Sequence, residues 1–419
     1  MFKILINSLK VKDIRIKMLY TLLILAIVRL GAHIALPGVD LISIKTMQNL
    51  YSSSTLYSII AGGANSQWSI FALGIGPYIT SSIIMQLLTV AIPKLEQLNK
   101  EGETGRKQIQ KYTRGLTIVL AVLQGIGTIM TYRDYFPGAT RMTYFLALIA
   151  MVAGTAFVMW LAEVITEKGV GNGTSFIIFV NIVSSIPMAM ASLSSYGNSS
   201  PAGWVKVVII AVILVLVMAF VVYVQGGERR IPVQYSSKIV GRRSYGGQAS
   251  NIPIKVSTAG VIAIIFAVSI LQLPQTINNF TGGGSSCLAR ASQFLSMTKP
   301  LGAIIYLLLI LAFSFFYTSI VINPNEMAEN MKKNGGFIPG IRPGAPTSKY
   351  ITRVVDRVTL VGAICFIIIA IIPLLLQWIF KINAGFGGTT LVIVAGVALD
   401  INKTLESQLL MRHYKGFLN

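Results

Sequence analysis

Long apolar runs separated by polar stretches dominate this chain. The first run extends from Met18 to Leu36 and the second from Trp68 to Pro93, and about ten such runs of 16 to 25 residues occur in all. A helix of about 20 apolar residues crosses a hydrocarbon core of about 30 Å. Because a backbone in lipid must satisfy its own hydrogen bonds, each run is predicted to be an α-helix. The pattern predicts a polytopic α-helical membrane protein.

Eight further runs complete the predicted set. They fall at roughly 115–132, 142–162, 174–193, 203–225, 256–273, 300–322, 358–378 and 385–399. The one candidate divide lies near Ser199–Gly203 and separates residues 1–200 from residues 201–419, with five helices in each half. Two similar halves with an odd number of helices are inverted relative to each other, a frequent plan in transport proteins. No clear internal sequence similarity supports the halves, so this prediction rests on the helix count.

The second run is more typical of a conduit than of a simple anchor. Gly74, Gly76 and Pro77 interrupt it, and Ile75 and Ile79 lie four residues apart on one helix face. Other runs also carry β-branched residues beside glycines or polar breaks, at Thr174, Ile178, Ile265 and Ile393. Apolar residues from several helices can meet in a constriction that blocks water and ions by dewetting. For any one of these residues, contact with lipid or with a neighbouring helix is the commoner role.

Positive charge is distributed unevenly over the predicted loops. The formal net charge is +21, although only 12% of the residues are charged. With the helices as assigned, 27 of the 35 Lys and Arg residues fall on one side, 7 on the other, and Arg29 within the first helix. Cytoplasmic loops carry the excess of Lys and Arg, so both termini are predicted to be cytoplasmic. Topology thus accounts for the charge, and no folded polar domain is present to bind nucleic acid.

The N-terminal segment mixes basic and apolar residues. Residues 1–17 are predicted to form an amphipathic helix on an anionic membrane surface. The segment and the first apolar run together resemble a signal peptide, but no small-residue cleavage site follows them, so we expect a retained helix.

The predicted spans lack the groups that catalysis or ion coupling requires. No Asp or Glu lies in the middle of a span, Glu163 stands at the cytoplasmic end of the fourth, and the only histidines are His33 and His413. Proton relays and ion-coupled transporters usually need such groups at membrane depth. No HExxH or phosphate-binding loop occurs, and Cys287 and Cys365 form no disulfide framework or metal ligand set. We predict a protein that is not an enzyme and has no cofactor or metal, and whose energy comes from a partner.

Two long loops combine basic charge with Gly, Pro and Tyr. They span residues 226–255 and 323–357, and each holds six Lys or Arg residues. Topology and contact with anionic lipid would explain the charges, but not the Gly, Pro and apolar content. We therefore predict ordered hairpins that dock a partner.

A short apolar segment lies at Leu56–Ala64. It is too short to span the membrane, so it must re-enter, lie flat or fill a cavity.

Together, these runs and loops resemble the SecY family, the channel subunits of the Sec protein translocase, over nearly the whole chain. The matching motifs are SIFALGIGPYITSSIIMQLL, KEGETGRKQIQKYTR, MWLAEVITEKGVGNGTS, GERRIPVQY, GRRSYGGQ, NPNEMAENMKKNGGFIPGIRPG and FGGTTLVIVAGVALD. The resemblance implies that the two five-helix halves form a clamshell around a central hourglass pore. It also implies a passive, gated channel that moves unfolded secretory proteins across the membrane and membrane proteins sideways into it.

The resemblance assigns roles to individual positions. The pore ring would consist of Ile75, Ile79, Thr174, Ile178, Ile265 and Ile393, where Thr174 departs from the usual aliphatic residue. A plug at about residues 51–67 would include Leu56, Tyr57, Ile59, Ile60, Gly62 and Gly63. The lateral gate would lie among the second, third, seventh and eighth helices, with Gln86, Gln124 and Ser257 as a polar cluster. Ordinary helix packing explains these three polar residues equally well.

The resemblance also implies partners and a location. The SecA ATPase or the ribosome would dock on Arg229, Arg230, Arg242, Arg243 and Arg342. Small membrane subunits of the SecE and SecG type and anionic lipids would surround the channel. The expected location is the bacterial cytoplasmic membrane, with the plastid thylakoid membrane as the alternative. Two other hypotheses are a secondary transporter of a small solute, which the missing buried carboxylates disfavour, and a membrane scaffold without a pore.

Overall fold

The computed structural model describes residues 6, 8–37, 69–131, 140–198, 203–235, 238–240, 243–245, 249–280, 294–295, 299–380 and 388–416. Its longer helices are α2 (Lys12–Gly31), α5 (Gly76–Ala91), α7 (Glu103–Thr131), α8 (Arg141–Lys168), α9 (Gly173–Asn198), α10 (Gly203–Gly226), α11 (Gly260–Phe280), α13 (Pro300–Val321), α15 (Ala345–Phe380) and α16 (Gly388–Gly416). Two shorter helices are α6 (Pro93–Lys100) and α14 (Pro324–Lys333). Every predicted apolar run therefore contains a helix. Within the described residues, five helices are long and apolar enough to cross a membrane, or six if the bent pair α5–α6 counts as one.

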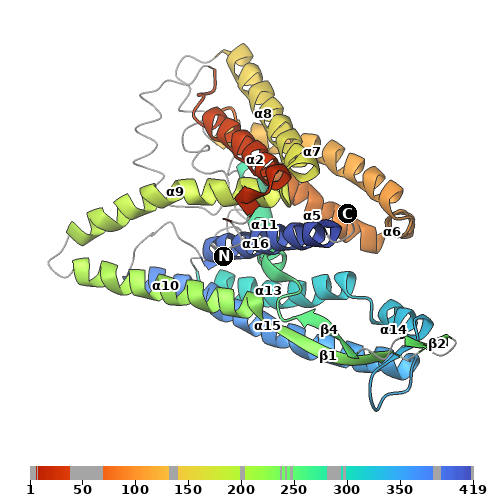
Figure 1. The fold of residues 1–419 in the computed structure, drawn as a ribbon. Helices are drawn as coiled ribbons and strands as arrows, with labels where there is room; N and C mark the ends of the chain where they lie inside the picture. The colour runs from red at the N-terminus through yellow and green to blue at the C-terminus, as the bar shows by residue number, and fades with distance from the viewer. Residues whose placement is uncertain are drawn as a thin grey trace.

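The helices form two groups with α16 between them (Figure 1). One buried cluster joins α2, α8 and α9 through residues such as Leu25, Val158 and Ile177. A second cluster joins α10, α11, α13 and α15 through residues such as Val221 and Ile264. Helix α16 belongs to both clusters, because Ile393 and Val397 face the first whereas Val392 and Ala395 face the second. The last helix therefore packs against both groups.

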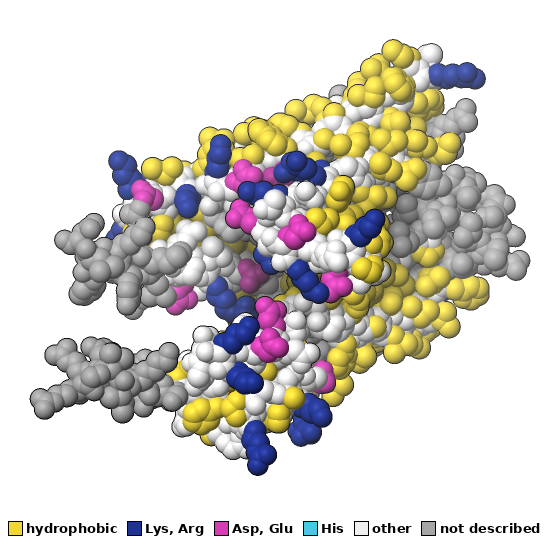
Figure 2. All heavy atoms as spheres, turned by 90° about the vertical axis from the view of Figure 1, so that its right-hand side faces the viewer, with side chains coloured by type: hydrophobic (Ala, Val, Ile, Leu, Met, Phe, Trp, Pro, Cys, Tyr) yellow, Lys and Arg dark blue, Asp and Glu magenta, His cyan; other side chains and the backbone are white. Residues whose placement is uncertain are grey.

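The outer surface is apolar along the flanks and charged at one end (Figure 2). Large side chains such as Leu22, Leu216 and Ile304 are exposed on the helices. Exposed apolar belts of this extent occur in proteins whose solvent is lipid. At the charged end the surface is hollowed between an upper and a lower part (Figure 2).

The lower part of this end is a small mixed domain. Strands β1 (Glu228–Tyr235) and β4 (Ala249–Lys255) pair antiparallel, and β1 also pairs with β5 (Gly336–Phe337) in the order β4-β1-β5. Strands β2 (Lys238–Val240) and β3 (Arg243–Tyr245) form a separate pair. Alternate residues of β1, Ile231 and Val233, are buried, as a sheet with one covered face requires. Helices α14 and α15 supply that cover, since their residues share a buried cluster with β1 and β4.

Several predicted boundaries are wrong in informative ways. The second run is not one helix from 68 to 93: residues 70–75 form a turn in which Gly74 has φ of +54°, and α5 begins only at Gly76. At Ile92 the chain bends by 100° into α6. The charged stretch that follows is mostly helix, since α7 begins at Glu103, well before the predicted position 115. Intrinsic helix propensity and i,i+4 ion pairs such as Lys107–Glu103 explain a helix that hydropathy does not reveal.

The two predicted hairpin loops have different outcomes. The loop at 226–255 is a β-hairpin, as predicted. The loop at 323–357 is not a hairpin, because it consists of α14, the short strand β5 and the first turns of α15. Helix α15 therefore continues from this domain into the helical body as one element of 36 residues. Part-way along it, a Cβ on Gly362 would lie 2.1 Å from the carbonyl oxygen of Val256, so the helix touches the turn that precedes α11.

At the N-terminus, α2 starts at Lys12 and continues without a break into the predicted first span. A separate surface helix over residues 1–17 is thus wrong for positions 12–17. The plug residues Leu56, Tyr57, Ile59, Ile60, Gly62 and Gly63 lie outside the described residues.

Candidate functional site

Five of the six predicted pore-ring residues meet in one apolar cluster. Ile75, Ile178 and Ile393 are buried, with exposed fractions of 1%, 5% and 3%. Ile79 and Ile265 are partly buried and pack against the same cluster. These side chains come from the N-terminus of α5 and from α9, α11 and α16. The fold thus gathers isolated isoleucines from four helices, distant in sequence, at one place.

The turn before α5 explains the burial of Ile75. Ser69 forms a bridge with Ala35, and the amide of Ile70 donates to the carbonyl of Ile34 over 3.0 Å. The turn is therefore tied to the end of α2. Ile75 is the N-cap of α5 with a buried side chain, and Ile79 follows one helical turn later. The glycine–proline break thus fixes where the isoleucine pair enters the cluster.

Thr174, the sixth predicted ring residue, has a polar environment. It lies in the first turn of α9 and is half-buried. Its backbone amide donates to Oδ1 of Asn172 over 3.0 Å, an N-cap that also receives the amide of Ser175. Its side chain lies beside Tyr78 on α5. At this position the constriction carries a polar contact instead of another aliphatic side chain.

A cavity of about 330 Å³ adjoins the cluster. Ile178, Ile265 and Ile393 line its apolar side. Its polar wall consists of Asn172, Ser175, Gln225, Lys255, Ser257, Thr258, Asp400, Lys403 and Thr404. A polar vestibule therefore leads directly to an apolar constriction, an arrangement that admits water on one side and excludes it on the other.

The three residues proposed for a polar gate cluster lie in different settings. Gln86 is exposed on α5, and Gln124 is half-buried on α7. Ser257 lies in the turn before α11, because this helix begins at Gly260 and not at 256, and it lines the cavity. Helix α7 packs against both α5 and α11, so the two helix groups meet along this seam.

Those predicted docking arginines that the structure describes lie on the small mixed domain. Arg229 and Arg230 are exposed on β1, and Arg230 forms an ion pair of 2.6 Å with Glu228. Arg243 belongs to β3, but its side chain and the whole of Arg242 lie outside the described residues. Arg342 is exposed in the turn between β5 and α15.

Two hydrogen bonds and a buried side chain hold the turn that carries Arg342 in place. The hydroxyl of Thr347 donates to the carbonyl of Arg342 over 2.9 Å, and the amide of Ile341 donates to the carbonyl of Ile338 over 3.0 Å. Ile338 is buried together with Ile231 and Ile351 in the core of the domain. We refer to this domain (residues 228–255 and 324–357) as the docking platform.

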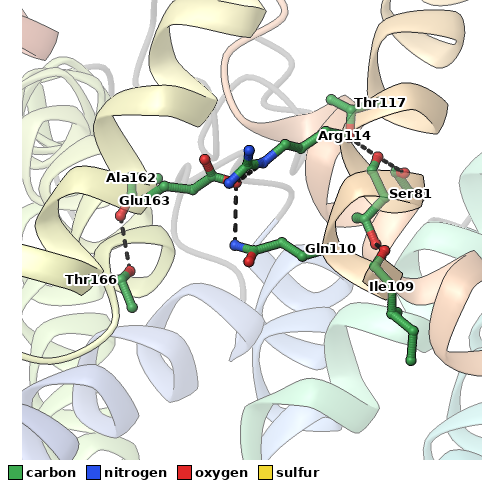
Figure 3. A network of polar contacts seen from close by, with 9 residues as sticks. Ser81, Ile109, Gln110, Arg114, Thr117, Ala162, Glu163 and Thr166 are labelled. Carbon is green, nitrogen blue, oxygen red and sulfur yellow. Dashed lines mark hydrogen bonds and ion pairs between the residues drawn. The ribbon is translucent and has the colours of Figure 1, made fainter. Parts of the chain in front are cut away.

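Sequence reasoning missed the polar contacts that link the helices near the constriction. Glu163 of α8 accepts from Nε of Arg114 over 2.7 Å and from Nε2 of Gln110 over 3.3 Å, both on α7 (Figure 3). Arg29 of α2 donates to Oδ1 of the buried Asn181 on α9 over 3.2 Å. The only available signal was an isolated acidic residue at a span end and an arginine within a span, and neither indicates its partner.

Comparisons with known proteins agree on one family. A family model described as SecY matches residues 69–402. The chain is 43% identical to protein translocase subunit SecY of Streptomyces scabiei, covering 98% of each chain. It is 41% identical to protein translocase subunit SecY of Escherichia coli K12, covering 97% of this chain and 94% of the relative.

Solved structures show the same fold at low identity. A structure described as a protein-conducting channel superposes with a TM-score of 0.65 at 18% identity, covering 93% of this chain and 91% of that one. Sec61 in the canine ribosome–channel complex gives a TM-score of 0.62 at 18% identity with the same coverage. Both likenesses concern the fold, including its ten helices in two halves.

Proposed function

The chain belongs to the SecY family of protein translocase subunits, and we propose that its isoleucine cluster is the resting seal of a protein-conducting channel. As a member of this family it is a multi-pass protein of the bacterial cytoplasmic membrane that conducts unfolded proteins across the membrane and membrane proteins into it. The observation that carries the proposal is the convergence of Ile75, Ile79, Ile178, Ile265 and Ile393 beside a polar cavity. Nothing in the comparisons supports a transporter of a small solute.

The chemistry of the constriction suits transit without binding. Aliphatic side chains offer no hydrogen bond to a passing backbone, so a polypeptide is not held there. The same side chains exclude water when the pore is empty, because a narrow apolar neck dewets. A flexible set of isoleucines would close around a moving chain and limit the passage of ions. The polar wall of the cavity keeps the entering segment hydrated until it reaches this neck.

Site-specific crosslinking tests the proposal directly. A photo-crosslinking amino acid is placed at Ile79 or Ile178, and a secretory precursor is stalled in the channel. We expect crosslinks from both positions. The control has the same amino acid at Leu216, which is 64% exposed on the outside of α10 and should not crosslink to the precursor. A stalled precursor that crosslinks to neither isoleucine would remove the constriction from the path.

We further propose that a cytoplasmic motor docks on the platform through Arg229, Arg230 and Arg342. All three are exposed basic residues of the docking platform. The canine relative named above was solved in a ribosome–channel complex, which supports the ribosome as one partner. A SecA-type ATPase is the other candidate, and SecE- and SecG-type subunits and anionic lipids would cover the apolar flanks.

The proposed orientation follows from the positive-inside rule and puts both termini and the platform in the cytoplasm. The segment 56–64 would then close the pore from the opposite side. Deleting it should raise the ion conductance of the reconstituted channel. An unchanged conductance would exclude this segment as the plug.

A further inference from the structure

Glu163 is held at the centre of a polar network that joins two helices. Its side chain is only 11% exposed, whereas that of Arg114 is 41% exposed. One carboxylate oxygen accepts from both Arg114 and Gln110, which stand one turn apart on α7 (Figure 3). An ionised acceptor makes these hydrogen bonds stronger than neutral ones. The carboxylate therefore links α7 to α8 at the ends that we propose to be cytoplasmic.

Further hydrogen bonds connect this pair of helices to α5. The hydroxyl of Ser81 on α5 donates to the carbonyl of Thr113 on α7 over 2.8 Å, and both residues are buried. The same carbonyl accepts from Thr117 over 2.7 Å (Figure 3). Thr113 is the residue directly before Arg114. A shift of α7 would thus disturb both the contact with α8 and the contact with α5.

The network also reaches the start of α9. The amide of Gly173 donates to the hydroxyl of Thr166 on α8 over 2.9 Å. The next residue, Thr174, lies beside Tyr78 on α5, and Tyr78 is also near the charges of Glu163 and Arg114. Hydrogen bonds thereby join α5 to α7, α7 to α8 and α8 to α9, and we refer to this set of contacts as the polar collar.

The collar lies directly beside the constriction. Tyr78 precedes Ile79 in α5 and packs against the isoleucine cluster, and Thr174 is one turn before Ile178 in α9. Three of the five isoleucines are therefore carried by helices that the collar ties together. Thr174, which weakens the ring as an apolar surface, directly follows Gly173 of the collar and lies beside Tyr78.

We propose that Glu163 and Arg114 are positioning residues for the channel seal. By holding α7 and α8 together with α5 and α9, their ion pair keeps Ile75, Ile79 and Ile178 in the closed arrangement while no substrate is present. This inference rests on the proposed role of the constriction. It further implies that these four helices move as one body.

Resting conductance of the purified channel in planar bilayers tests this role. Glu163→Gln keeps the shape of the side chain but removes its charge. We expect its resting conductance to rise about fivefold or more, the change in an open–closed ratio that about 1 kcal/mol produces. Glu167→Gln is the matched control, because Glu167 is an exposed acidic residue one turn further along α8, and it should leave conductance unchanged. Abundance and thermal stability are measured for both variants.

A charge swap separates positioning from a general effect on folding. The double variant Glu163→Arg with Arg114→Glu should leak less than either single variant, because the attraction between the helices is restored. Arg114→Lys, which keeps the charge but loses the planar donor, provides a second, milder variant if Glu163→Gln does not fold.

Two outcomes are informative in different ways. If Ile178→Ala leaks but folded Glu163→Gln and Arg114→Lys channels stay as tight as the parent, the positioning role is refuted and the seal remains. If Ile178→Ala also stays tight, the proposed function of the constriction itself fails.

Discussion

Replacing Ile351 by alanine should loosen the docking platform without opening the channel. Ile351 lies on α15 and has an exposed fraction of 0%. It belongs to the buried cluster that joins α15 to β1 and β4. The change removes three carbon atoms, so the lost transfer free energy is about 2.4 kcal/mol at about 0.8 kcal/mol per methylene. The cavity left behind adds to this, giving a total in the range of about 2–5 kcal/mol.

The loss should appear first in the turn that carries Arg342. Thr347, whose hydroxyl holds the carbonyl of Arg342, is one helical turn before Ile351. We expect faster trypsin cleavage within residues 324–357 of the channel in lipid nanodiscs, together with weaker binding of the motor or ribosome. Resting ion conductance should not change, because the isoleucine cluster is a separate core.

A matched variant on the same helix controls for the chemistry of the substitution. Ile364 has an exposed fraction of 45% and faces outwards, so Ile364→Ala should cost little and leave the cleavage rate unchanged. Equal protease resistance of the Ile351→Ala and parent channels would refute the view that this small core orients the platform. A leak in Ile351→Ala comparable to that of a constriction variant would refute the independence of the two cores.

Three further predictions concern single contacts. Gly154→Ala would put a Cβ 2.2 Å from the carbonyl oxygen of Ile70, so it should displace the turn before α5, lower thermal stability and raise resting conductance. The control is Gly115→Ala, whose Cβ would have nothing within 4 Å and which should be neutral or slightly stabilising. Equal behaviour of the two variants would contradict the packing argument. Asn172→Ala removes the N-cap of α9 and should lower stability by about 1 kcal/mol in thermal unfolding, whereas Asn172→Asp should retain it. Arg342→Glu should impair secretion while protein abundance stays normal, with Arg342→Lys as the control; loss of the protein itself would indicate a role in folding or topology instead.

Hydrophobic runs located the spans well because length and apolar content are local properties of the sequence. The same measure could not show that α7 begins at Glu103, since its first turns are polar and helical by propensity. Hydropathy also could not show that residues 70–75 form a turn and that α5 begins only at Gly76. The burial of Ile75 depends on a contact between Ile70 and Ile34, which are far apart in the chain.

The docking platform illustrates a second limit. A basic, Gly- and Pro-containing loop predicted order, and the hairpin of β1 and β4 was found. The pairing of Gln234 with Phe337 and the packing of Ile351 beneath β1 join segments about a hundred residues apart. No local pattern encodes such a pairing, because strand register depends on which faces are buried together.

The constriction residues came from the resemblance and not from periodicity, which favours lipid or helix contact for each isoleucine alone. Glu163 was visible as an acidic residue at the end of a span. Its partner Arg114 was counted among the loop charges, so the pair could be recognised only when α7 and α8 were placed side by side.

The length of α15 gives the platform a mechanical connection to the seal. At 1.5 Å per residue its 36 residues extend about 54 Å. One end belongs to the surface on which we propose that a motor docks. Gly362 lies against the backbone of Val256, in the turn before α11, the helix that carries Ile265. A rigid rod with a fulcrum at this point would act as a lever arm. A tilt of the platform by a few degrees would then be transmitted as a sideways displacement of α11, so that motor binding and the first widening of the neck would be a single mechanical event.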